Sequence, residues 1–221
     1  MSDDPVPERS KKGLNDPRAV DILTTEHWSL LSARALGYQE MIGRATIFVT
    51  ILSGTVIALT LMAQATQFGR ETLLVGLLLI SVALFIGLVT FIRMVAINYE
   101  DAKWVTGMNL LRHAYLQIVP ELEPFFVAGH EPGVDRKALA HGAPQHARNL
   151  ANSLTTTSSV VAALNSILVG SLVSDVAALC GAGLTLVATS GVAASLVSAV
   201  LHVRYAARFR RRHAPLPERS S

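Results

Sequence analysis

Residues 45–63 read ATIFVTILSGTVIALTLMA, and residues 72–92 read TLLVGLLLISVALFIGLVTFI. Neither stretch contains a Lys, Arg, Asp or Glu residue. As an α-helix, the shorter stretch would be about 28 Å long, which is close to the thickness of the hydrocarbon core of a bilayer. The two stretches therefore predict two membrane-spanning helices, joined by a short polar turn near Gln67–Gly69.

Two further apolar runs follow in the second half of the chain, at residues 154–173 and 176–203, with a predicted turn at Ser174-Asp175. Only 16% of the 221 residues are charged, whereas a soluble domain usually carries about 25%. The predicted fold class is an all-α membrane protein with four spans, arranged as two helical hairpins. The hairpins cover residues 17–118 and 144–207.

The basic residues predict the topology. Of the 19 Lys and Arg residues, only Arg70 lies in one of the two short turns between paired spans. Short loops rich in Lys and Arg face the cytoplasm. Both termini and the segment between the hairpins are therefore expected in the cytoplasm, with the protein in the inner (plasma) membrane.

The segments that flank the first hairpin predict a cytoplasmic stalk of two antiparallel helices. Asp16-Pro17 is a good helix start, and the apolar residues after it recur at the alternating three- and four-residue spacing of a coiled coil. A second seam of this kind follows the second span. If paired residue numbers sum to about 135, Arg34 meets Asp101. The predicted stalk contacts are Trp28, Leu31, Arg34, Tyr38, Ile97, Asp101, Trp104, Met108, Leu111 and Tyr115.

Three segments are predicted to lie outside the hairpins. Residues 1–16 form a polar arm and residues 208–221 a basic tail, both expected to be disordered because they offer little apolar surface to bury. Residues 119–143 form a cytoplasmic loop interrupted by Pro and Gly. His130, His141 and His146 in or near this loop match no standard metal-ligand spacing, so no metal site is predicted.

Small residues recur along spans one, three and four, where they allow helices to approach closely. Asn165 is an amide within the third span, and such a group in lipid needs a partner. It is expected either to hold helices together or to line a polar path. The candidate pore or helix-packing residues are Asn165, Ser166, Gly170, Gly54, Gly191 and Ser195.

Four arginines near the C-terminus, Arg208, Arg210, Arg211 and Arg212, predict contact with anionic lipid headgroups. Nucleic acid is not expected as a partner, because no stacking aromatics are interleaved with the basic residues. No phosphate-binding loop, nucleophile elbow or paired catalytic carboxylates occur. We therefore expect no catalytic residues, no enzymatic activity and no cofactor.

Three functions remain open from the sequence. The leading hypothesis is a homo-oligomeric membrane scaffold or pore with Asn165 near its axis. The alternatives are a small transporter with a polar midplane site around Asn165, and a membrane-tethered module whose stalk binds a cytoplasmic protein. The chain resembles small bacterial multi-pass membrane proteins, and its layout of helix plus hairpin is similar to that of two-span bacterial effector modules. This resemblance is architectural and includes no functional motif.

Overall fold

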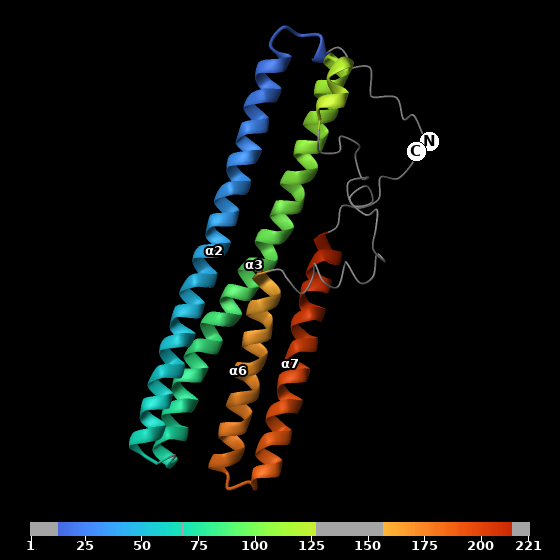
Figure 1. Ribbon diagram of the computed structural model, residues 1–221. Coiled ribbons are helices and arrows are strands. Elements are labelled where there is room, and N and C mark those ends of the chain that lie inside the picture. Colours follow the sequence, from blue (N-terminus) through green and yellow to red (C-terminus); the bar gives the residue numbers. More distant parts are fainter. Residues whose placement is uncertain (1–12, 68, 127–156, 214–221) are drawn as a thin grey trace. The chain divides into compact units, whose positions relative to one another are not determined.

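The computed structural model describes residues 13–67, 69–126 and 157–213 (Figure 1). Within these ranges the elements are α2 (Ala19–Ala65), α3 (Arg70–Ile118), the 3₁₀ helix η1 (Pro120–Phe125), α6 (Thr157–Leu179) and α7 (Leu184–His213). The four α-helices are each long and apolar enough to cross a membrane. The predicted all-α class with four apolar helices is thus confirmed.

Several predicted segments lie outside the described residues. They are the N-terminal arm up to residue 12, the loop from residue 127, the polar segment before Thr157 and the tail from residue 214. The first part of the predicted loop is described and contains η1, which starts with Pro120 and contains no buried residue.

The first helix begins as predicted. The Asp16 carboxylate accepts a hydrogen bond from the backbone N–H of Arg18 at 2.9 Å, which satisfies one of the amide groups that a helix start leaves unpaired. Pro17 occupies the position where its missing N–H costs nothing. The turn to α3 also lies where it was predicted. Gln67 has a φ of 51°, and the hydroxyls of Thr66 and Thr72 hydrogen-bond across the turn.

The turn between the last two helices does not lie at Ser174-Asp175, where the sequence analysis placed it. Helix α6 continues to Leu179, and α7 begins at Leu184. Gly181 has a φ of 77°, its N–H donates to the Ala178 carbonyl, and the Ala182 N–H donates to the Ala177 carbonyl, both at 3.0 Å. This is the Schellman motif, in which a left-handed glycine ends a helix. Because glycine has no Cβ, it reaches this conformation at little cost. Gly181 therefore ends the helix, and Asp175 remains inside it.

The last helix is longer than predicted. Residues 208–213 were assigned to the disordered tail, but α7 extends to His213. Phe209 packs against the hydrophobic core, and its ring lies 6.3 Å from the ring of Tyr205 one turn earlier. These contacts stabilise the helix beyond the end of the apolar run.

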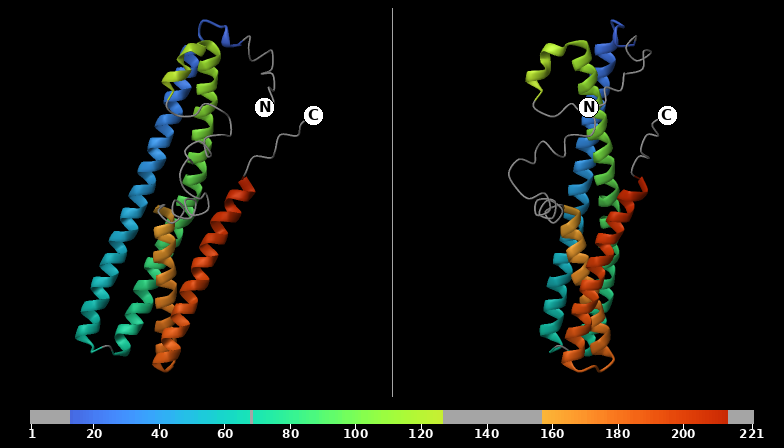
Figure 2. Two further views of the ribbon diagram at one scale, coloured as in Figure 1. Left: turned by 45° about the vertical axis from the view of Figure 1, so that its right-hand side comes forward. Right: turned by 90° about the vertical axis from the view of Figure 1, so that its right-hand side faces the viewer.

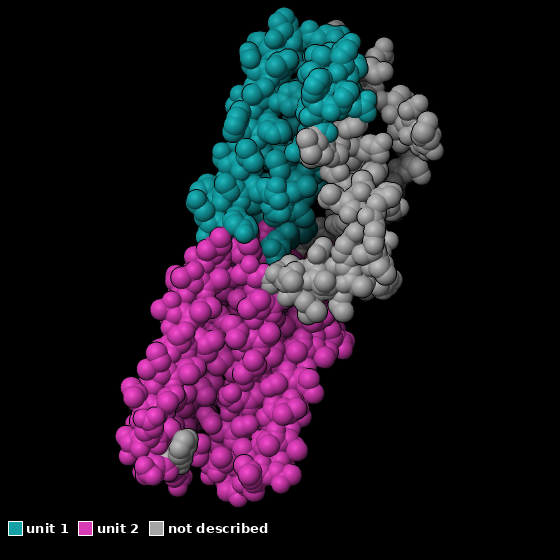
Figure 3. All heavy atoms as spheres, in the orientation of Figure 1, with its two compact units in different colours: residues 1–39, 98–149 teal, residues 40–97, 150–221 magenta. Residues whose placement is uncertain are grey.

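The chain divides into two compact units (Figure 3), one comprising residues 1–39 and 98–149, the other residues 40–97 and 150–221. In the described part of the first unit, the N-terminal part of α2 packs on the C-terminal part of α3. Tyr115 contacts Thr24, and Arg34 contacts Asp101. Residues later in α2 contact residues earlier in α3, so the two helix segments are antiparallel.

The second unit contains the remaining part of α2 and α3 together with α6 and α7. Figure 2 shows α6 and α7 side by side in both views. The hydrophobic core of this unit comprises Phe48, Ile80, Ala83, Phe91, Met94, Val95, Val161 and Leu168. Large apolar side chains also cover its outside, such as Phe85 at 69% exposure and Leu196 at 63%. An apolar outer surface of this kind is stable in lipid and costly in water, which supports a membrane-embedded protein.

Candidate functional site

The interior of the second unit holds an unpaired amide. Asn165 on α6 is fully buried, and neither its Nδ2 nor its Oδ1 has a hydrogen-bond partner among the described residues. Gly87 of α3 lies directly against it, since a Cβ at position 87 would overlap Oδ1 and would lie 2.6 Å from the ring of Phe48 on α2. Three helices therefore enclose the amide, and Gly87 leaves the room for it.

The position of Asn165 corrects one expectation. Asn165 was expected near the axis of an oligomeric scaffold or pore, but its side chain is enclosed by helices of its own chain. A buried amide without hydrogen bonds costs free energy, so the residue has no obvious stabilising role through polar contacts. Its neighbour Ser166 is also buried, and the Ser166 hydroxyl donates to the Ala162 carbonyl at 2.8 Å.

The predicted small residues of α6 and α7 pack against one another. A Cβ on Gly170 would lie 2.6 Å from the carbonyl oxygen of Gly191 and would overlap the hydroxyl of Ser195. The Ser174 hydroxyl donates to the Val187 carbonyl at 3.1 Å and so links the two helices. Small side chains thus permit close backbone approach in a membrane, as expected. Gly54 differs, because a Cβ there would meet nothing within 4 Å.

A buried histidine near the end of the fourth apolar run is a second polar group of the interior. His202 is buried, and its Nδ1 lies 2.8 Å from the Ser198 carbonyl oxygen, which assigns the proton to Nδ1. The ring of Phe91 meets the imidazole edge-on, with 4.6 Å between centroids. The Nε2 atom is buried and has no partner among the described residues. The burial of this side chain was not foreseen from the sequence.

An ion cluster joins α2 and α3 just outside the uncharged runs. Arg93 donates to both oxygens of Glu40, from Nε at 2.9 Å and from Nη2 at 2.8 Å, and Arg44 Nε adds a third bond at 2.8 Å. The Arg93 and Arg44 guanidinium groups lower the pKa of Glu40 to about 2. Sequence reasoning missed this cluster, although the i,i+4 spacing of Glu40 and Arg44 and the proposed register were signals for it.

This cluster predicts an acid-dependent loss of stability. Because the folded state lowers the pKa of Glu40 from its ordinary 4.5 to about 2, its contribution to stability is present above pH 4.5 and disappears as the pH falls towards 2. We expect Glu40→Gln to unfold at a lower temperature than the parent protein at pH 7. The difference should shrink steadily between pH 4.5 and pH 2, as followed by circular dichroism melts in detergent. A constant difference over this range would contradict the assignment.

In the first unit, one of the predicted pairs of stalk residues is in contact. Arg34 Nε donates to Asp101 at 2.7 Å, which is the ion pair that the proposed register gives. On α3, Met108 is buried, whereas Trp104, Leu111 and Tyr115 are half-buried. Ile97, the predicted seam residue that falls in the second unit, is also buried. The α3 seam therefore faces inward.

The α2 seam that the sequence analysis proposed does not face α3. Trp28 is 63% exposed, Tyr38 is 61% exposed and Leu31 is 40% exposed. Instead, Leu30 contacts α3, because a Cβ on Gly107 would lie 3.0 Å from its methyl group, and Gly37 is buried. The face of α2 that contains Leu30 therefore meets α3, and Trp28, Leu31 and Tyr38 are left exposed.

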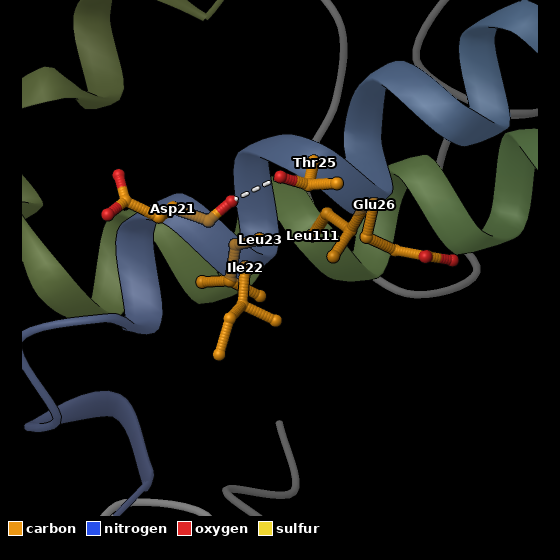
Figure 4. Close-up of a pocket in the computed structure, with 6 residues that line it drawn as sticks. All are labelled: Asp21, Ile22, Leu23, Thr25, Glu26 and Leu111. Atoms are coloured by element: carbon orange, nitrogen blue, oxygen red, sulfur yellow. Dashed lines mark hydrogen bonds between the residues drawn. The ribbon is translucent and has the colours of Figure 1, made fainter.

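Two other features lie on the surface of the described residues, namely the arginines of α7 and a depression in the first unit. Arg208, Arg210 and Arg212, which were predicted to contact lipid headgroups, are exposed on α7. A surface depression of about 450 Å³ in the first unit is lined by Asp21, Ile22, Leu23, Thr25, Glu26 and Leu111 (Figure 4). Its two carboxylates point away from each other, so the depression has no convergent polar groups to bind a ligand.

Among the described residues, no group of three or more His, Cys, Asp or Glu side chains could hold a metal ion. The loop histidines His130, His141 and His146 lie outside the described residues. Comparisons of the chain with protein-family models, with curated proteins and with solved structures find no match.

Proposed function

We propose that the protein is a homo-oligomeric scaffold in the plasma membrane, without catalytic machinery of its own. In this proposal all four apolar helices cross the bilayer, and both termini lie in the cytoplasm, as the distribution of Lys and Arg favours. The first unit then projects into the cytoplasm as a stalk. The arginines of α7 contact anionic headgroups at the same membrane surface.

One observation carries the proposal, namely the exposure of large apolar side chains on the first unit. Trp28 and Tyr38 are more than half exposed in a part of α2 that precedes its uncharged run. If this part lies in water, two large aromatic side chains on one helix face are costly unless another protein covers them. A second copy of the chain in the same membrane can supply this cover.

A scaffold is favoured over a pore because the amide of Asn165 and the imidazole of His202, two strongly polar groups of the second unit, are enclosed. Asn165 and His202 are buried within their own chain, and a conduction path between copies would require polar groups on the outside. The outer surface of the second unit carries large apolar residues instead, of which Leu78 and Val203 are examples. Such a surface is adapted to lipid.

The proposal predicts a defined oligomer in lipid. Purified full-length protein in lipid nanodiscs should exceed the mass of empty nanodiscs by at least twice 23.7 kDa, and by a whole multiple of it, as measured by mass photometry. The assembly should persist on dilution into the nanomolar range. A monomer under these conditions would overturn the scaffold, and the exposed aromatics would then belong to a binding surface for a different protein.

A further inference from the structure

We infer that two copies of the chain pair in parallel through the outward face of α2, along the stripe Trp28, Leu31, Ala35, Tyr38 and Ile42. This inference rests on the proposed homo-oligomer and specifies its interface. The five residues, which we call the α2 stripe, are all exposed. They repeat at intervals of three, four, three and four residues, which is the pattern that forms the seam of a coiled coil.

Within residues 13–67, 69–126 and 157–213, the α2 stripe is an exposed seam without a partner. In the first unit, α2 contacts α3 through other residues, namely Leu30, Thr24 and Arg34. An amphipathic helix has one apolar face for its own core, whereas this segment of α2 has two. The second face therefore needs a second helix.

The charges around the α2 stripe favour an identical partner. In a parallel symmetric pair, each residue meets its own copy, so like charges beside the seam would repel. The neighbouring positions carry Ser32, Gln39 and Met41, which are uncharged. Arg34 is the charged neighbour, and its ion pair with Asp101 at 2.7 Å neutralises it within its own copy. Two copies inserted in one membrane with the same topology also have parallel α2 helices.

The same helix continues into the apolar run with a face suited to helix contact. Thr46 follows Ile42 by one helical turn, and Thr46, Thr50 and Gly54 are exposed in the second unit. A Cβ on Gly54 would meet nothing within 4 Å. By contrast, the exposed side chains of α3 include Leu78 and Phe85, which suit lipid. Small residues promote close contact between helices in a bilayer, so the pairing can extend from the α2 stripe into the membrane.

The length of this contact is sufficient for a stable dimer. From Trp28 to Gly54 the helix rises about 40 Å, which is the length of roughly three to four heptads. The aromatic residues lie in the part of the seam where water would otherwise contact them. Covering them supplies the hydrophobic contribution that lipid cannot provide between helices inside the membrane.

Cysteine cross-linking in the full-length protein tests the inference. The natural Cys180 is exposed and is first replaced by Cys180→Ser. Tyr38→Cys then reports on the α2 stripe, and Leu36→Cys is the matched control, because Leu36 is equally exposed at 66% but lies two residues away, on the other side of the helix. In membranes treated with a mild oxidant, Tyr38→Cys should give several-fold more disulfide-linked dimer than Leu36→Cys.

The outcomes separate the interface from the oligomer. Equal cross-linking by the two variants in protein that is oligomeric by mass photometry would overturn the α2 interface and leave the scaffold standing. A monomer by mass photometry, together with no cross-linked dimer, would overturn both the α2 interface and the proposed scaffold. A Tyr38→Cys adduct in native membranes whose mass is not twice 23.7 kDa would identify a different protein as the occupant and would overturn the pairing of copies.

A charge variant gives an independent readout. Tyr38→Glu would place two carboxylates opposite each other in a symmetric pair, and the population of dimers should fall several-fold in nanodiscs. Leu36→Glu should leave the population unchanged. Both side chains are exposed, so neither substitution disturbs the packing within the chain, and matching circular dichroism melts of the two variants would verify this. Equal dimer populations in both variants would overturn the inference.

Discussion

Replacing Gly87 with alanine is expected to cost the protein about 1–3 kcal/mol of unfolding free energy, or more, as overpacking of a tight core does. The added Cβ would overlap Asn165 Oδ1 and would lie 2.6 Å from the ring of Phe48. The amide is fully buried and has nowhere to move. Unfolding by SDS titration in mixed micelles, or circular dichroism melts in detergent, would measure the loss.

Gly43→Ala is the matched control for this prediction. It makes the same change in a long helix, but a Cβ at position 43 meets nothing within 4 Å. Alanine is the better helix former by up to about 1 kcal/mol, so this variant should be neutral or slightly more stable. The double variant Gly87→Ala/Asn165→Ala should recover part of the loss, because it removes the amide oxygen but not the Phe48 ring. Equal stability of Gly87→Ala and Gly43→Ala would contradict the enclosed position of Asn165.

The second large effect is expected from Gly170→Ala. The new Cβ would lie 2.6 Å from the carbonyl oxygen of Gly191. This atom belongs to a helix backbone and cannot rotate away, so α6 and α7 must separate along their contact. We expect a loss of about 1–3 kcal/mol, measured by the same SDS titration.

Two further variants test the cause of this effect. Gly191→Ala should cost less, since its Cβ would lie 3.0 Å from the Gly170 carbonyl oxygen and its main overlap is with the hydroxyl of Ser174. Combining Gly191→Ala with Ser174→Ala should therefore restore most of the lost stability. Combining Gly170→Ala with Ser195→Ala should restore little, because the backbone clash remains. The reverse order would show that the hydroxyls, and not the backbones, limit the approach of α6 to α7.

Much of the interior could be foreseen from spacing and residue size. The small residues Gly170, Gly191 and Ser195 recur on helix faces, and small residues have few other uses inside a membrane. The register that joins Arg34 to Asp101 follows from the position of one short turn, because helix geometry then sets which residues lie opposite each other. The same register brings Glu40 close to Arg93, so that ion cluster was within reach of the sequence but was not recognised.

Other features were beyond the reach of sequence patterns. Apolar periodicity identified the stripe with Trp28 and Tyr38 on α2, but the helix has a second face with Leu30 and Gly37, and periodicity alone does not say which face meets α3. The stripe with the two aromatic residues was the stronger sequence pattern, yet the face with Leu30 is the one that contacts α3. The last turn was misplaced because Ser174-Asp175 resembles a helix boundary, whereas Gly181 is the residue that adopts a positive φ of 77°.

By itself, the sequence determined the solvent of this protein and the number of its long apolar helices. Uncharged runs of about 20 residues satisfy their backbone hydrogen bonds within one helix, and they expose side chains that only lipid solvates well. Only the tertiary structure decided which faces of those helices meet, and therefore that Asn165 and His202 are enclosed while the α2 stripe remains free. Packing depends on the shapes of side chains on two or three helices at once, and a linear pattern contains only one helix at a time.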